Sequence, residues 1–243
     1  MLVAIGGLIL VRRIAPASAR EQGTSGMGWI YAAMHVMYGV TLAFSLFLTW
    51  QQFTEAQRAS LSEANRVEEI HQLVETFSGP EKEKVQSLAE TYARVVIEEE
   101  WALLGKGKDS RPSPRAEALA GELRRSVESL RPRTAGEEAL VVQGVDFIAE
   151  FEEFRLTRVL ESRQGIPSIL WAVLLIGGAI TVAYTFLFGV RNPWLHGVAV
   201  SALTVVIVLV IYAVYRIDYP YTGDVRVQPS AFELVLERME DEP

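Results

Sequence analysis

The sequence predicts an all-α integral membrane protein with a helical soluble domain inserted between its second and third spans. Residues 28–50, 166–190 and 192–215 contain no Asp, Glu, Lys or Arg. Each of these segments exceeds the roughly 20 residues that cross a bilayer core as a helix. Tryptophan and tyrosine lie near their ends, as is typical of membrane interfaces. Half of the 243 residues are hydrophobic, yet 22% are charged, so we expect a large water-facing part as well.

A short fourth span is predicted at the start of the chain. Residues 1–11 are apolar and run into Arg12 and Arg13, but as a helix they reach only about 16 Å, at a rise of 1.5 Å per residue. They lack the basic start and the small-residue cleavage site of a signal peptide. A helix lying in the membrane interface is the alternative. Residues 1–50 are therefore predicted to hold spans one and two, and residues 166–215 spans three and four.

The soluble domain is predicted over residues 51–165, where most of the charge lies. No turn signal follows Trp50, so we expect the second span to continue outward as one long helix. Ser78 is then a plausible N-cap for a second helix that reaches Leu104. Residues 105–114 are rich in Gly, Pro, Ser and Lys, which predicts a loop.

Two more helices are predicted before the third span. The first is short and amphipathic, and Pro132 ends it. Thr134 and Glu137 have the spacing of a capping box and predict the start of the second. The residues expected to be buried along that last helix are Val141, Val145, Ile148, Phe151 and Phe154.

The C-terminal tail, residues 216–243, is predicted to contain a polar turn and a short helix over residues 231–240. Two spans separate this tail from the soluble domain, so both are expected on the same side of the membrane. Arginines near the span ends are more numerous on that side than in the opposite loops. Because basic residues favour the cytoplasm, the soluble domain and the tail are predicted to be cytoplasmic.

Composition and motifs argue against several classes of function. The net charge of −7 argues against a nucleic-acid partner, which requires a basic face. No cysteine is present, and no nucleotide-binding or hydrolase motif occurs, so we predict no enzyme, no cofactor and no metal site. His71 follows Glu68 at the spacing of a helical metal pair, but no second copy exists. That pair, like the acidic run at residues 98–100, is predicted to lie on a solvated face.

One side of the second span carries a candidate pore lining. Five residues recur at helical spacing, apolar at the start and hydroxyl-bearing towards Trp50: Ile30, Met34, Tyr38, Thr41 and Ser45. Such a side either packs against other spans, as small hydroxyl residues often do, or lines an oligomeric pore. His35, in the same span, is a candidate polar or pH-sensing group, with a hydrogen bond to a neighbouring helix as the alternative.

Four stretches of the sequence resemble the bestrophin-like family of bacterial membrane proteins. They are YGVTLAFSLFLTWQQFTEA (residues 38–56), EANRVEEIHQLVETF (63–77), TYARVVIEEEW (91–101) and DYPYTGDVRVQP (218–229). The resemblance covers most of the chain from about Gly28 onward. Its most specific parts are the Glu100-Trp101 pair and the turn containing Asp218, Pro220 and Gly223.

The resemblance implies a pentameric homo-oligomeric ion channel in the bacterial inner membrane, because bestrophins are pentameric channels with four spans. Ile30, Met34 and Tyr38 would then lie at an apolar neck in the second span. The implied partners are the lipid bilayer and the permeating ions. Calcium gating is not implied, since only Asp218 and Asp224 follow the last span before the terminal helix. The alternative is a non-conducting membrane scaffold or sensor whose cytoplasmic helices bind a partner.

Overall fold

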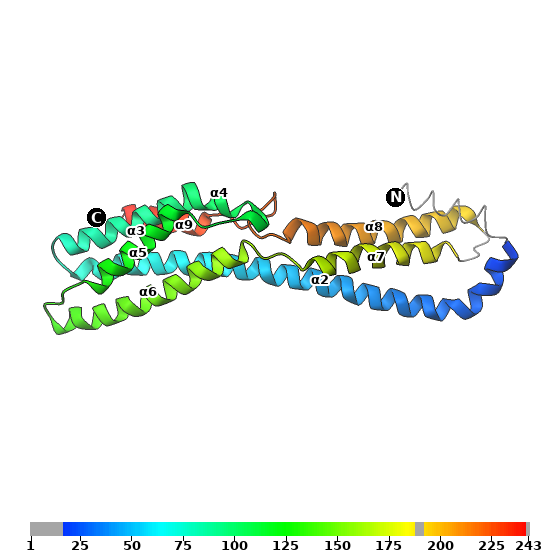
Figure 1. The fold of residues 1–243 in the computed structure, drawn as a ribbon, viewed down its shortest axis with the longest axis horizontal. Helices are drawn as coiled ribbons and strands as arrows, with labels where there is room; N and C mark the ends of the chain where they lie inside the picture. The colour runs from blue at the N-terminus through cyan, green and yellow to red at the C-terminus, as the bar shows by residue number, and fades with distance from the viewer. Residues whose placement is uncertain (1–16, 188–191, 242–243) are drawn as a thin grey trace. The chain divides into compact units, whose positions relative to one another are not determined.

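The computed structural model describes residues 17–187 and 192–241, with side chains from Gly28 onward (Figure 1). The described residues are helices joined by turns and loops and contain no strand, which confirms the all-α prediction. The short span predicted at residues 1–11 lies outside them. The chain divides into two compact units: unit 1 comprises Met1–Trp50 and Ile166–Arg216, and unit 2 comprises Gln51–Gly165 and Ile217–Pro243.

Unit 1 is built from three apolar helices. They are the first part of α2 (Ala17–Leu73), α7 (Ser168–Thr185) and α8 (Pro193–Ile217). Among the described residues, these are the helices long and apolar enough to cross a membrane. Their core is small, and large apolar side chains such as Val206 and Ile176 stay exposed on the unit. Helices that are apolar on all sides suit a lipid environment, and the protein is a membrane protein.

Unit 2 is a bundle of helices that also includes the second part of α2. It contains η1 (Val74–Thr76), α3 (Pro80–Val95), the π-helical turn η2 (Val96–Glu100), α4 (Trp101–Leu104), η3 (Gly107–Asp109), α5 (Pro114–Glu128), α6 (Ala135–Glu161) and α9 (Ser230–Asp241). Helix α5 packs against both α3 and α6, and α9 packs against α3.

Two helix starts in unit 2 test the predicted N-caps: the start of α6 agrees with the prediction and the start of α3 does not. At α6 the Thr134 side chain accepts a hydrogen bond from the amide of Glu137, at 3.1 Å, which confirms the predicted cap. At α3 the predicted cap, Ser78, is wrong. The N-cap is Gly79, with φ of 96°, a conformation that glycine adopts without the steric penalty of a Cβ. Pro80 then fits the first helical position, where its missing N–H costs nothing.

The predicted burial along α6 is correct for Ile148 and Phe151 and wrong for Val145, which is 44% exposed. The buried positions of the helix are three or four residues apart: Gly144, Ile148, Phe151, Arg155 and Arg158. Val145 lies one residue past Gly144 and so turns away from this face, because successive helical residues are rotated by about 100°. The buried face continues through two arginines rather than apolar side chains.

The C-terminal segment fills the core of unit 2. Phe232 of α9 lies near the rings of Tyr92 and Trp101, and Tyr221 packs edge-on against Trp101. The indole of Trp101 donates a hydrogen bond to the carbonyl of Val227, at 3.1 Å. Residues that precede α7 and residues that follow α8 in the sequence therefore build one hydrophobic core.

Candidate functional site

The five predicted pore-lining residues of α2 differ in exposure within unit 1. Ile30 is 57% exposed, and Met34 and Thr41 are half-buried. Tyr38 and Ser45 are buried. The predicted stripe therefore lies along the boundary between the free side of α2 and the side that contacts the other spans.

Tyr38 faces α7 across a close contact. Its hydroxyl donates a hydrogen bond to the carbonyl of Leu174, at 2.8 Å. A Cβ added to Gly178 would lie 2.6 Å from that hydroxyl oxygen, and one added to Gly177 would lie 2.9 Å from the ring. Both distances are shorter than van der Waals contact, so the two glycines let the tyrosine lie against the backbone of α7.

The hydroxyl groups of Thr41, Ser45 and Thr49 are satisfied within α2 itself. Thr41 donates to the carbonyl of Met37 at 2.9 Å, and Ser45 donates to that of Thr41 at 2.8 Å. Thr49 repeats the pattern by donating to Ser45. These donors need neither water nor another helix, which suits an apolar environment.

His35 belongs to a cluster of rings near the start of the span. Its Nε2 lies 2.9 Å from the hydroxyl of Tyr31, and the two ring centroids are 3.9 Å apart. Tyr31 also stacks on Tyr184, the next-to-last residue of α7, at 5.4 Å. His35 is therefore hydrogen-bonded to a tyrosine of its own helix, α2, and that tyrosine contacts α7.

The interior of unit 2 holds a cluster of ionised side chains from three elements. Arg158 of α6 donates to Glu63 of α2 through Nε at 2.5 Å and Nη2 at 3.0 Å. The same Nη2 donates to Glu100 at 2.8 Å, and Arg155 donates to Glu100 at 2.9 and 3.3 Å. Two positive and two negative charges are thus enclosed together.

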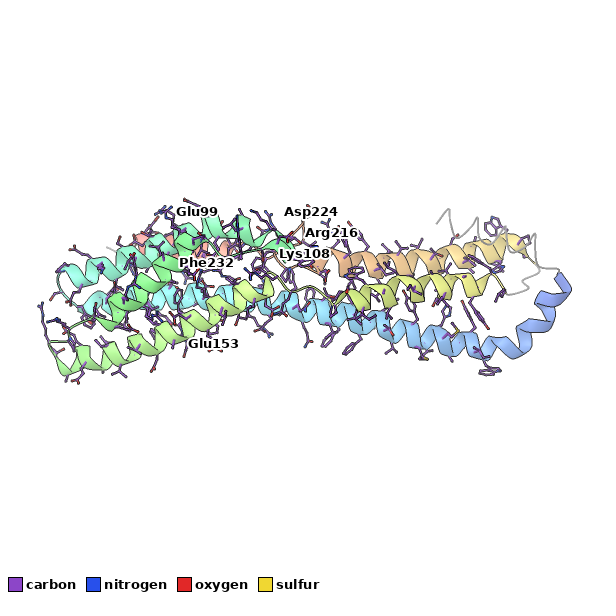
Figure 2. All side chains as sticks on the ribbon, in the orientation of Figure 1. Glu99, Lys108, Glu153, Arg216, Asp224 and Phe232 are labelled. Atoms are coloured by element: carbon purple, nitrogen blue, oxygen red, sulfur yellow. The ribbon has the colours of Figure 1, made fainter. Side chains whose placement is uncertain are left out.

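Aromatic side chains complete this cluster. The hydroxyl of Tyr92 donates to Glu63 and accepts from Nη1 of Arg155, at 2.9 Å. The guanidinium carbon of Arg158 lies 5.6 Å from the ring centres of both Trp101 and Phe232. Such placement over aromatic faces favours a cation that is shielded from water. Figure 2 labels Phe232, which α9 brings to this core.

The pKa values of the cluster show that its charges are kept. Burial by itself would raise the pKa of Glu100, but attraction from Arg158 and Arg155 holds it below its ordinary value. Burial opposes the charge of Arg158, yet the two carboxylates raise its pKa well above the usual range. Burial raises the pKa of Tyr92, which stays a neutral hydrogen-bond donor. Glu100, Arg155 and Arg158 are therefore charged at neutral pH.

Glu161, at the end of α6, lies in an environment that disfavours its negative charge, in contrast to Glu100. Its Oε2 is buried and has no hydrogen-bond partner within the described part of the chain. Burial raises the pKa of this carboxyl, and the nearby charge of Glu55 raises it further. The folded protein therefore favours the protonated form of Glu161 more than water does.

Sequence reasoning misses this charge cluster. The prediction that Glu100 lies on a solvated face is wrong, because it is fully buried at the end of the π-turn η2, and π-turns often occur where a helix serves a special role. A usable signal is present in α6, where Arg155 and Arg158 continue the spacing of Ile148 and Phe151. Charged residues in an apolar stripe imply partners in the core.

The predicted solvated position of His71 is also wrong, since this side chain is buried. Its Nε2 lies 3.4 Å from Glu90, whereas Glu68 contacts Arg238 of α9 instead. Within the described residues no group of three His, Cys, Asp or Glu side chains is arranged to hold a metal ion.

Three apolar helices in one unit and a helical bundle around a buried ion cluster in the other define a helical membrane protein. The sequence pattern of the Bestrophin-like domain matches residues 1–232. The chain therefore belongs to the bestrophin-like family.

Two solved structures share this fold. The crystal structure of a bacterial bestrophin homologue from Klebsiella pneumoniae, determined with a single mutation, is similar at a TM-score of 0.74, with 10% identity over 99% of this chain and 97% of that one. The crystal structure of a membrane protein that also carries a point mutation gives a TM-score of 0.72, with 9% identity over 99% of this chain and 97% of that one. No curated protein matches the sequence.

Proposed function

We propose that the chain forms a homo-oligomeric ion channel whose pore is lined by α2. The observation that carries this proposal is the match of the Bestrophin-like domain to residues 1–232, together with a fold that a bestrophin homologue shares over 97% of its own length. Three apolar helices supply the membrane part that a channel needs. A pentamer in the bacterial inner membrane, with unit 2 in the cytoplasm, is the assembly we propose.

The exposure of the five candidate side chains of α2 supports two different roles among them. Ile30, Met34 and Thr41 keep accessible surface in a single protomer and are our candidates for the pore wall. Tyr38 and Ser45 are buried and would hold the span against its neighbours from behind. An apolar segment of this kind can close a pore by excluding water, and oligomerisation would bring copies of it around an axis.

Reconstitution tests the proposal directly. Purified protein in liposomes is expected to pass ions, as measured by dye-reported flux, and cryo-electron microscopy is expected to show rotational symmetry with α2 around the axis. A monomer or dimer that passes no ions would contradict the channel and favour the scaffold or sensor.

A further inference from the structure

The part of α2 that lies in unit 2 has one exposed side. Four exposed residues recur there at intervals of seven: Gln51, Arg58, Asn65 and Gln72. Seven residues are close to two full turns of an α-helix, so these four residues lie on one side of it. Buried residues of the same stretch, such as Glu63 and Val67, lie on the opposite side. We refer to the four exposed residues as the α2 polar side.

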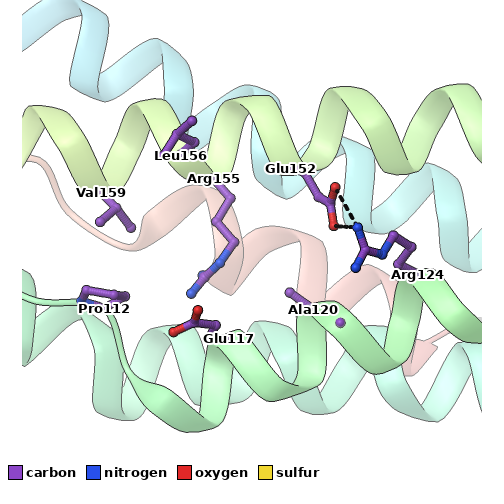
Figure 3. Close-up of a pocket in the computed structure, with 9 residues that line it drawn as sticks. Pro112, Glu117, Ala120, Arg124, Glu152, Arg155, Leu156 and Val159 are labelled. Carbon is purple, nitrogen blue, oxygen red and sulfur yellow. Dashed lines mark hydrogen bonds and ion pairs between the residues drawn. The ribbon is translucent and has the colours of Figure 1, made fainter.

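The α2 polar side carries less charge than another outer surface of unit 2, since three of its four residues are neutral amides. The exposed residues of α5 are mostly charged: Arg115, Glu117, Glu122, Arg124, Arg125 and Glu128. Some of these charges pair with a neighbouring helix, as Arg124 does with Glu152 of α6 at 3.3 Å (Figure 3). Neutral amides can contact a passing ion without holding it tightly, which is what a conducting path requires.

Arg58 is the charged member of the α2 polar side. It forms no hydrogen bond or ion pair with the described part of the chain. Other charged residues of the same stretch of α2 contact neighbouring helices. Arg66 contacts Glu150 of α6 at 2.5 Å, and Glu68 contacts Arg238 of α9 at 3.4 Å. The guanidinium of Arg58 is therefore available to a mobile ion.

Glu55 is the acidic residue of α2 that lies nearest to Arg58 in the sequence. Its charge acts on the end of α6, where it raises the pKa of Glu161. Residues 28–54, which precede it, contain no Asp, Glu, Lys or Arg. Arg58 is therefore the first basic group of α2 after the apolar residues that we propose for the pore wall.

We propose that the ion path of the channel continues along the α2 polar side and that Arg58 makes this path selective for anions. In a ring with α2 around its axis, every copy would contribute one Arg58 at the same level. Rings of arginine favour anions, because their summed positive potential attracts anions and repels cations. The inference rests on the proposed channel and adds the residue that sets its preference between ions.

A charge series at Arg58 in the full-length protein tests this role. In planar bilayers with a KCl gradient, the reversal potential gives the ratio of chloride to potassium permeability. The wild type is expected to prefer chloride, Arg58→Gln to lower the ratio several-fold, and Arg58→Glu to reverse the preference. Arg131→Glu, the same change at another exposed arginine of unit 2, should keep the wild-type ratio. Hydrogen exchange of α2 should match the wild type in every variant, because Arg58 is exposed.

Chemical restoration of the charge separates its effect from that of side-chain shape. The chain contains no cysteine, so a thiol reagent modifies Arg58→Cys at the substituted position alone. A positively charged methanethiosulfonate is expected to restore the chloride preference of this variant, and a negatively charged one to lower it further. A wild-type channel that prefers potassium, or a permeability ratio that stays the same in every Arg58 variant, would overturn the role of Arg58 and leave the channel standing. Wild-type protein that passes no current would overturn the channel, and this inference with it.

Discussion

At the scale of single residues, Arg158 determines the balance of charge inside unit 2. It is fully buried and contacts both Glu63 and Glu100. Placing these ions away from water is costly, and their mutual attraction offsets the cost only while every partner is present. Removing one partner therefore weakens the unit more than the pair itself stabilises it.

We predict that Arg158→Met lowers the free energy of unfolding of unit 2 by about 3–5 kcal/mol, the usual cost of leaving a buried charge without its partner. The measurement is hydrogen exchange of α3 and α6 backbone amides in the purified protein. Arg94→Met is the control, because Arg94 forms an exposed pair with Glu240, and such pairs contribute about 0–1 kcal/mol. Equal effects of the two substitutions would contradict the assignment.

For Glu161 we predict that a substitution stabilises the protein instead of destabilising it. Its raised pKa means that the folded state disfavours the ionised form, so stability falls as the pH rises from the ordinary value of 4.5 through the raised one. We expect Glu161→Gln to increase the unfolding free energy at pH 8 and to leave it nearly unchanged at pH 4. Denaturant titrations at the two pH values measure this. Glu237→Gln, at an exposed site on α9, should show no such difference.

At the scale of elements, the contact between α2 and α7 depends on small residues. The two glycines of α7 let Tyr38 reach the carbonyl of Leu174, and α8 adds Ile207 to the same core. The spans therefore meet through shape as much as through apolar character, since lipid competes equally for apolar surface.

We predict that Gly178→Ala destabilises unit 1 by about 1–3 kcal/mol, as overpacking usually does. Thermal unfolding in detergent measures the effect. The matched control is Gly197→Ala in α8, where no atom lies within 4 Å of the added Cβ; it should be neutral or slightly stabilising. Combining Gly178→Ala with Tyr38→Phe should restore part of the loss, because the clashing oxygen is gone. Additive effects would show that the contact is not the cause.

The sequence predicts the elements better than their buried polar partners. A long segment without charged residues is recognised directly from the sequence: α7 lies within the predicted residues 166–190, and α8 runs two residues past the predicted residues 192–215. The burial of Glu100 depends on Arg158, which lies 58 residues away, and local patterns do not carry that information.

At the scale of the whole molecule, the proposed channel makes the free side of α2 its functional surface. We predict that Ile30→Ala and Met34→Ala each raise ion flux several-fold, because a wider or less apolar constriction stays wet more readily. Single-channel recording in planar bilayers measures the change. Val206→Ala, on the exposed side of α8, is the control and should conduct like wild type. Unchanged flux in both α2 variants would remove them from the pore.

The discontinuous core of unit 2 also bears on how the protein is made. The ribosome finishes α6 before it begins α7 and α8, yet Tyr221 and Phe232, which close the core, come after both. Until those residues emerge, the nascent unit exposes Trp101 and the Glu63–Arg158 pair to water. Synthesis of α7 and α8 must therefore precede the final packing of the helices of unit 2. Biogenesis is in this way ordered by the position of α9 in the chain.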